Sequence, residues 1–171
     1  MAKTRRPPIP IVTQVAVLFR DSWLCHLCRR PIVLHLALKH LDAFAREQGV
    51  TSPLAYWDPN WRRDKSPLLD ELAASIDHVE AYSRGGAHGL ENFAAVCARC
   101  NARKSAKAKD AYLLENPPWE VKGLHGEPTH WDGLSSLYVV LARTKRDRLT
   151  PAEREWLKAI EMVLENPGRA V

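Results

Sequence analysis

The spacing of hydrophobic residues changes along the chain in a way that predicts a mixed α+β fold. In several segments apolar residues return every three or four positions, which is the pattern of a helix with one buried face. These segments lie near positions 13–19, 32–48, 134–143 and 150–165. Two shorter apolar runs, at about 74–79 and 93–96, instead predict two strands with a glycine-containing loop between them.

Local signals set the ends of several of these elements. Gly49 ends the second helical segment, and a capping box with proline at the first helical position opens the last one at Thr150. A further helix is expected from the second cysteine pair to about Leu114, where Asn116 and the two prolines after it end the helix. The polar, proline-containing stretch 51–67 is expected to be a loop.

Composition narrows the class of protein. Of the 171 residues, 46% are hydrophobic, which is enough to bury a core. No run approaches the ~20 apolar residues that a membrane helix needs. The apolar stretch 9–19 is interrupted by Pro10 and has no small-residue cleavage site of the kind found in exported proteins. We therefore expect a cytoplasmic protein with no membrane association.

Positive charge is concentrated in two parts of the chain. The net charge is +5 and the isoelectric point is near 9.2. Residues 1–30 carry six basic side chains and one acidic one, and residues 99–109 carry five basic side chains and no acidic one. Taken alone, such a run suits a solvated surface. Because both runs adjoin a cysteine pair, they favour binding to the phosphate backbone of a nucleic acid.

The four cysteines form two pairs of identical spacing, Cys25/Cys28 and Cys97/Cys100. A CxxC pair makes a tight knuckle whose thiolates point at one ion, and two knuckles complete the tetrahedral sulfur cage that Zn²⁺ favours. Free or disulfide-bonded cysteines suit a small secreted protein, whereas this chain has ample apolar content and no secretory signal. The spacing predicts a structural Zn²⁺ site.

Between and beyond these pairs lies an ordered set of polar residues. It consists of Asp77-His78-Val79, Gly85-Gly86, Asn92 and Cys97-x-x-Cys100-Asn101-x-x-Lys104. In this order and spacing the set resembles the HNH endonucleases (His-Me finger nucleases), specifically the variant whose ββα-metal core is clamped by four cysteines. The resemblance covers roughly residues 12–112. It implies an α+β fold in which a two-stranded antiparallel sheet and one helix are stapled by zinc, with a mainly helical insertion and C-terminal extension.

The resemblance also implies roles for individual residues. His78 would act as general base, since an imidazole with an ordinary pKa of about 6.5 accepts a proton at neutral pH. Asp77 and Asn101 would bind the catalytic Mg²⁺ or Mn²⁺ through oxygen, and Asn92 would orient the His78 ring. The residues expected to contact nucleic-acid phosphates are Arg84, Arg99, Arg103, Lys104 and Lys107.

The chain departs from the family pattern at three points. Asn101 stands where the family often has histidine, and an oxygen ligand there favours Mg²⁺ or Mn²⁺ over a softer metal. Ala81 stands where proline is common. The stretch between Cys28 and Asp77 is long enough for a helix and a loop, where many relatives have a short hairpin.

The expected organisation follows from the resemblance. It comprises a basic flexible arm (1–11), a nuclease domain (12–114) with a helical and loop insertion (about 32–73), and a C-terminal loop and helical extension (115–171). The expected partner is DNA, with RNA left open, in a bacterial or phage-like setting. Two alternatives remain: a catalytically silent zinc module that binds nucleic acid, and a nuclease effector subunit whose C-terminal helices dock a protein partner or form a homodimer.

Histidines and tryptophans outside this set are expected to be surface or core residues. His88 is set apart from the other histidines, because its glycine loop borders the expected phosphate site. Trp119 and Trp131 are expected to anchor their loop on the core rather than stack on bases.

Overall fold

The computed structural model describes residues 7–51, 71–118 and 131–166. Its helices are α1 (Ile11–Arg20), α2 (His35–Glu47), α3 (Ala98–Lys104), α4 (Lys109–Glu115), α5 (Ser135–Thr144) and α6 (Pro151–Glu165), and its strands are β1 (Ala74–His78) and β2 (Phe93–Cys97). Short 3₁₀ turns occupy Tyr82–Arg84, Leu90–Asn92 and Arg146–Arg148. The expected α+β class is confirmed, and the expected loop 51–67 lies almost wholly outside the described residues.

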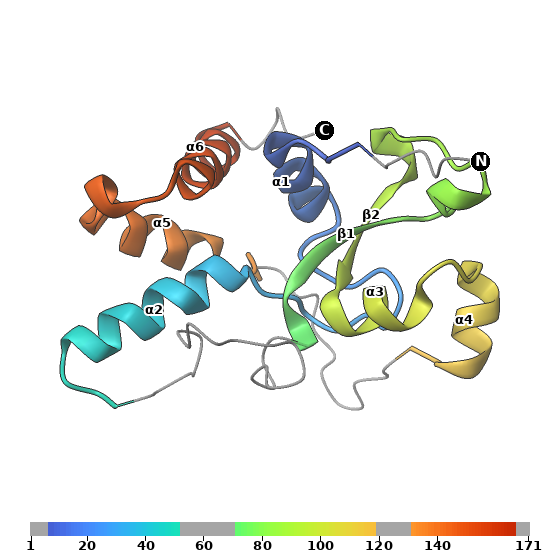
Figure 1. Ribbon diagram of the computed structural model, residues 1–171, viewed down its shortest axis with the longest axis horizontal. Coiled ribbons are helices and arrows are strands. Elements are labelled where there is room, and N and C mark those ends of the chain that lie inside the picture. Colours follow the sequence, from blue (N-terminus) through green and yellow to red (C-terminus); the bar gives the residue numbers. More distant parts are fainter. Residues whose placement is uncertain (1–6, 52–70, 119–130, 167–171) are drawn as a thin grey trace.

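The two strands form an antiparallel sheet at the centre of the molecule (Figure 1). The register pairs Ala74 with Cys97 and His78 with Phe93. The loop between the strands therefore begins directly after His78 and ends at Phe93. All five residues of β2 are buried, which explains why its sequence is a continuous apolar run. Helix α3 follows β2 without a gap and completes a ββα unit, as the sequence predicts.

The other edge of β2 is covered by the N-terminal segment. The amide of Ala95 donates to Asp21 Oδ2 at 2.8 Å, and the carbonyl of Ala95 accepts from the amide of His26 at 2.8 Å. The guanidinium of Arg20 donates to the carbonyl oxygens of Phe93 and Leu90. These contacts satisfy strand groups that would otherwise be unpaired, and they fix α1 and the first cysteine pair against the sheet.

The remaining helices lie on one side of the sheet, with α3 and α4 on the other (Figure 1). Helix α2 packs on α5, and α1 packs on α6. The predicted role of Trp131 is confirmed, because its indole nitrogen donates to the carbonyl of Ile32 at 2.9 Å. Gly133 has a φ of +64°, and a Cβ there would lie 2.0 Å from the Trp23 ring, so this close contact requires glycine. Trp119 lies outside the described residues.

The last helix begins as its sequence predicts. The Thr150 side chain and the Glu153 amide form one half of a capping box, and the Glu153 carboxylate accepts from the Thr150 amide to form the other half. Glu153 also pairs with Lys39 of α2 at 2.8 Å. Burial raises the pKa of Glu153, but the hydrogen bonds from Lys39 and Thr150 outweigh it and lower the pKa to about 2. In the described part of the chain, none of the helices is long and apolar enough to span a bilayer.

The expectation of one helix from the second cysteine pair to Leu114 is wrong. Helix α3 ends at Lys104, and α4 begins only at Lys109. Ser105 adopts a φ of 49°, which an α-helix cannot continue, and the amide of Lys107 turns back to the carbonyl of Lys104. The break separates the basic side chains of this region into two groups, one on α3 and one at the start of α4.

Candidate active site and metal centre

The four cysteines gather at one point, although they lie far apart in the sequence. Their sulfur atoms all lie within 4.8 Å of one another, and those of Cys28 and Cys97 are 3.9 Å apart. Each knuckle is closed by an amide that faces the first sulfur of its pair, from Cys28 to Cys25 and from Cys100 to Cys97. This geometry suits four thiolates around a single tetrahedral metal ion.

The electrostatics of the cluster also favour a cation. Contacts with the neighbouring thiols, that of Cys100 foremost, raise the pKa of Cys28 and Cys97 and lower that of Cys25. The cluster therefore cannot hold four thiolates by itself, because each negative charge disfavours the next. A bound divalent ion would supply the missing positive charge and stabilise the deprotonated form of each ligand. The residues present fit a metal ion.

Asp77 and His78 end β1 and face opposite sides of the sheet. Consecutive strand residues alternate in direction, and the contacts of the two side chains agree with this. Asp77 faces α3, where its carboxylate meets Lys104, whereas the His78 ring lies among residues of the loop between the strands. Both are buried, with 8% of Asp77 and 1% of His78 exposed. The ββα unit therefore positions an acid and an imidazole at the same strand end.

Lys104 is buried, whereas a residue that contacts a nucleic-acid phosphate is expected at the surface. Its side chain is fully buried, and its ammonium lies 2.8 Å from Asp77 Oδ2 and 3.3 Å from the carbonyl oxygen of His78. A buried charge of this kind is tolerated only when it is paired. The expectation that Lys104 binds a substrate phosphate therefore conflicts with its placement, and its contacts assign it to holding the Asp77 carboxylate.

Asn101 lies on α3 over the same face of β1. Its amide nitrogen donates to Ser75 Oγ at 2.8 Å, and Ser75 is two residues before Asp77 on the strand. Residues two apart on a strand share a face, so α3 brings Asn101 and Lys104 over Ser75 and Asp77 respectively. With its nitrogen committed to Ser75, the side chain keeps its amide oxygen as an acceptor.

Asn92 contacts the loop backbone and does not orient the His78 ring directly. Its side-chain oxygen accepts from the amide of Glu80 at 2.8 Å, and its nitrogen donates to the carbonyls of Glu80 and Ala87. Its own carbonyl accepts from the amide of Val79. The side-chain amide of Asn92 thus clamps the loop backbone, so the expected orientation of the His78 ring by Asn92 would act through this loop.

The His78 ring is enclosed by three aromatic residues. Its Nε2 lies 3.1 Å from Nδ1 of His88. Phe93 packs edge-on against the ring, with ring centroids 4.9 Å apart, and Tyr82 lies at 5.9 Å. The sequence pointed to His88 only through its place in the glycine loop. A contact across ten residues of irregular backbone leaves no periodic signal, so the pairing itself could not be read from the sequence.

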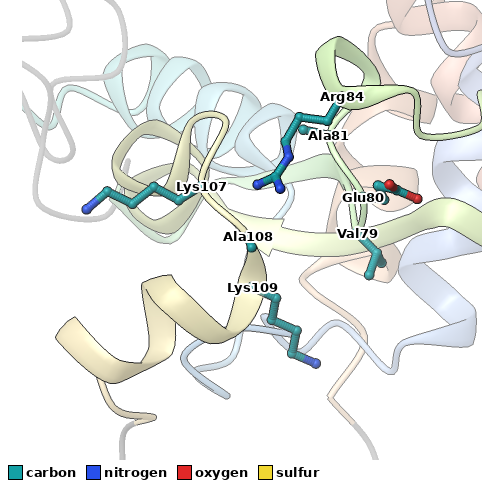
Figure 2. Close-up of a pocket in the computed structure, with 7 residues that line it drawn as sticks. All are labelled: Val79, Glu80, Ala81, Arg84, Lys107, Ala108 and Lys109. Carbon is teal, nitrogen blue, oxygen red and sulfur yellow. The ribbon is translucent and has the colours of Figure 1, made fainter.

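A basic pocket of about 180 Å³ opens directly after the Asp77-His78 strand end. Its lining residues are Val79, Glu80, Ala81, Arg84, Lys107, Ala108 and Lys109. In Figure 2 the Arg84 guanidinium reaches toward the backbone at Ala108, while the Glu80 carboxylate points away from it. Lys107 pairs with Glu115, but among the described residues neither Arg84 nor Lys109 forms an ion pair. Two cations are therefore available to an anion here.

The remaining basic residues of the expected nucleic-acid contacts differ from one another. Arg99 pairs with Glu71 at 2.9 Å, and Arg103 is exposed on α3. Lys109 was expected to contact phosphate only as part of the basic run 99–109 and was not named individually. Burial is the main cause that lowers the pKa of His26, and the positive charge of Lys109 is the second. Because His26 stands within the first knuckle, Lys109 lies near that knuckle.

Comparison with known proteins identifies this region. Residues 65–107 match the family model described as HNH endonuclease. This segment of the chain is similar to HNH endonucleases. No curated protein and no solved structure matches the chain. The match confirms the predicted resemblance, and the HNH family suggests nuclease-type activity and metal binding for this segment.

The HNH match covers only part of the assembled site. It includes Asp77, His78, Asn92 and Asn101 together with the second knuckle, but Cys25 and Cys28 lie outside it. The first knuckle nevertheless contributes half of the sulfur cage. The HNH segment is thus completed by the N-terminal part of the chain.

The structural role of the sulfur cluster can be tested by removing one of its cysteines. Replacing Cys97 with serine removes one ligand, so we expect the bound metal to be lost and the free energy of unfolding to fall by at least about 3 kcal/mol, or roughly 6–12 °C in Tm. Elemental analysis and thermal unfolding of pure protein measure both quantities. As a control, a chelator should lower the Tm of the wild type but leave that of Cys97→Ser unchanged. Metal-free wild-type protein with the same Tm as the metal-loaded form would contradict this role.

Proposed function

We propose that the protein is a metal-dependent HNH endonuclease that hydrolyses phosphodiester bonds of DNA, by nicking or by double-strand cleavage. The observation that carries the proposal is the ββα unit whose first strand ends in Asp77 and His78, directly beside a pocket with two available cations. Phosphodiester hydrolysis needs a base for the attacking water, stabilisation of the charged phosphate and help for the leaving oxygen. Each requirement has a candidate group at this strand end.

His78 is the proposed general base. Among the polar residues of the strand end, an imidazole is the group that takes up a proton near neutral pH. The ring removes a proton from water as the water oxygen attacks phosphorus. The bond from phosphorus to the 3′-oxygen breaks as the new bond forms, and the departing oxygen takes a proton from solvent water, which leaves 5′-phosphate and 3′-hydroxyl ends.

Asp77 and Asn101 are the proposed ligands of Mg²⁺ or Mn²⁺. A carboxylate and an amide oxygen are hard donors of the kind that these ions prefer. A bound ion there would supply positive charge to the phosphate and the leaving oxygen. The contribution of the chain is to preset its ligands: Lys104 holds the Asp77 carboxylate at 2.8 Å, and Ser75 fixes the Asn101 amide. We further propose that the ion in the sulfur cage is structural Zn²⁺, which favours four thiolates.

Arg84 and Lys109 are the proposed phosphate contacts nearest the reaction. The pocket they line begins at Val79, the residue after His78, so a nucleic-acid strand that reaches the imidazole passes over it. Arginine and lysine contacts with phosphate fix the position of the backbone but read no bases, so we expect weak sequence preference. Exposed Arg103 extends the positive surface along α3.

The phosphate pocket is tested by charge removal. The double variant Arg84→Gln, Lys109→Gln should bind a DNA duplex at least about tenfold more weakly at low salt, and should reduce the slope of log affinity against log salt by about 1 to 2. Fluorescence anisotropy across a salt series measures both. The matched control is Arg154→Gln, an exposed arginine on α6, which should leave affinity unchanged. Equal affinity and slope in the wild type and the double variant would rule the pocket out.

The catalytic assignment is tested with supercoiled plasmid. Wild-type protein with Mg²⁺ should convert the plasmid to nicked or linear forms, and excess EDTA should stop the reaction. His78→Ala should lower the cleavage rate by at least about 100-fold because it removes the base, while DNA affinity stays unchanged. Gel densitometry over time gives the rates.

Other outcomes separate the competing functions. Tight DNA binding without cleavage by the wild type would favour the catalytically silent module. Cleavage that survives EDTA, or His78→Ala protein at the wild-type rate, would contradict the proposed mechanism. A ribonucleotide substrate run in parallel distinguishes RNA from DNA as the target.

A further inference from the structure

A second histidine contacts the ring of the proposed base. His88 stands in the loop between the strands, and its Nδ1 lies 3.1 Å from Nε2 of His78. At this distance the two nitrogens share one hydrogen, so one ring donates and the other accepts. The ring planes are inclined by only 31°, and Phe93 packs edge-on against both rings. The two imidazoles are therefore held as one unit.

We propose that His88 is the positioning residue of His78, and that it accepts the hydrogen carried by Nε2 of His78. This inference rests on the proposed nuclease function. A neutral imidazole donates from one nitrogen and accepts at the other. If His78 donates through Nε2, its Nδ1 carries the lone pair that can take a proton from water. If His88 donated instead, Nε2 of His78 would be the acceptor, and the lone pair of neutral His78 would not be available to water.

The loop that carries His88 is held in place by Asn92. Its side-chain amide makes three hydrogen bonds to the backbone of Glu80 and Ala87, and Ala87 immediately precedes His88. Gly86 lets the loop close tightly, because a Cβ there would lie 2.0 Å from the carbonyl oxygen of Glu80. Asn92 thus acts on the base indirectly. It holds the loop that carries His88, and His88 in turn positions the ring of His78.

The tautomer of His78 can be measured without any cleavage assay. Long-range ¹H–¹⁵N correlation spectra of the full-length, metal-loaded protein, labelled with ¹⁵N-histidine and kept free of Mg²⁺, distinguish ring nitrogens with and without hydrogen. The spectrum of His78→Ala assigns the His78 signals. We expect hydrogen on Nε2 and none on Nδ1 in neutral His78. Hydrogen on Nδ1 would overturn the proposal, whether or not the protein is a nuclease.

Two substitutions at one position separate the hydrogen bond from mere packing. Asparagine places a carbonyl oxygen near the site of the lost Nδ1, so His88→Asn should keep the acceptor, whereas His88→Ala removes it. We expect His88→Ala to lower kcat by about 10- to 100-fold with KM unchanged, since a loosened base is misaligned but DNA is still bound. His88→Asn should recover most of the loss. His35→Ala, at an exposed histidine on α2, is the control and should match the wild type.

The outcomes distinguish this inference from the proposed function. An inactive wild type would defeat the nuclease assignment, and the spectrum would still decide the role of His88. Equal kcat in His88→Ala and the wild type, or equal losses in His88→Ala and His88→Asn, would overturn the acceptor role. If His88→Ala unfolds or loses its metal, the wild-type spectrum and the asparagine variant decide the question.

Discussion

The convergence of four cysteine sulfurs at one point is the constraint on which the rest of the structure depends. It joins the N-terminal knuckle to the end of β2, and the same N-terminal segment then occupies the free edge of that strand through Asp21 and His26. Because β2 is fixed on both edges, β1 has a defined register and ends at His78. Helix α3 starts from the second knuckle, so its direction across Asp77 is set by the same cluster. A cation at this point would thus organise residues that lie outside the sulfur cage.

The basic residues in and beside the HNH match include two contrasting kinds. Lys104 is buried and paired with Asp77, and its charge is consumed in holding that carboxylate. Arg84 and Lys109 line an open pocket and are available to an anion. Arg84 comes from the loop between the strands. The break at Ser105 ends α3 at the buried lysine and places the next lysines, Lys107 and Lys109, beside the pocket. In a single continuous helix, these lysines would have lain beyond the pocket.

Much of the fold could be predicted from the sequence because its signals are local. The CxxC pairs, the capping box at Thr150 and the apolar run of β2 each depend on neighbouring residues, and each appears where expected. What the sequence could not give were contacts between distant side chains. Lys104 looks like any other basic residue of its run, and its burial follows only from the packing of α3 on β1. The contacts of Asn92 and His88 depend likewise on the path of a loop, which has no period to read.

X-ray absorption at the zinc K-edge tests most directly whether one cation holds the two knuckles together. For full-length protein purified without added chelator, we expect stoichiometric zinc with four sulfur neighbours at about 2.3 Å. The same spectrum should disappear from Cys28→Ser and Cys97→Ser protein alike, since each knuckle supplies two of the ligands. A first shell containing nitrogen or oxygen in place of sulfur, or folded protein with no stoichiometric zinc, would contradict a cation as the organising element of this structure.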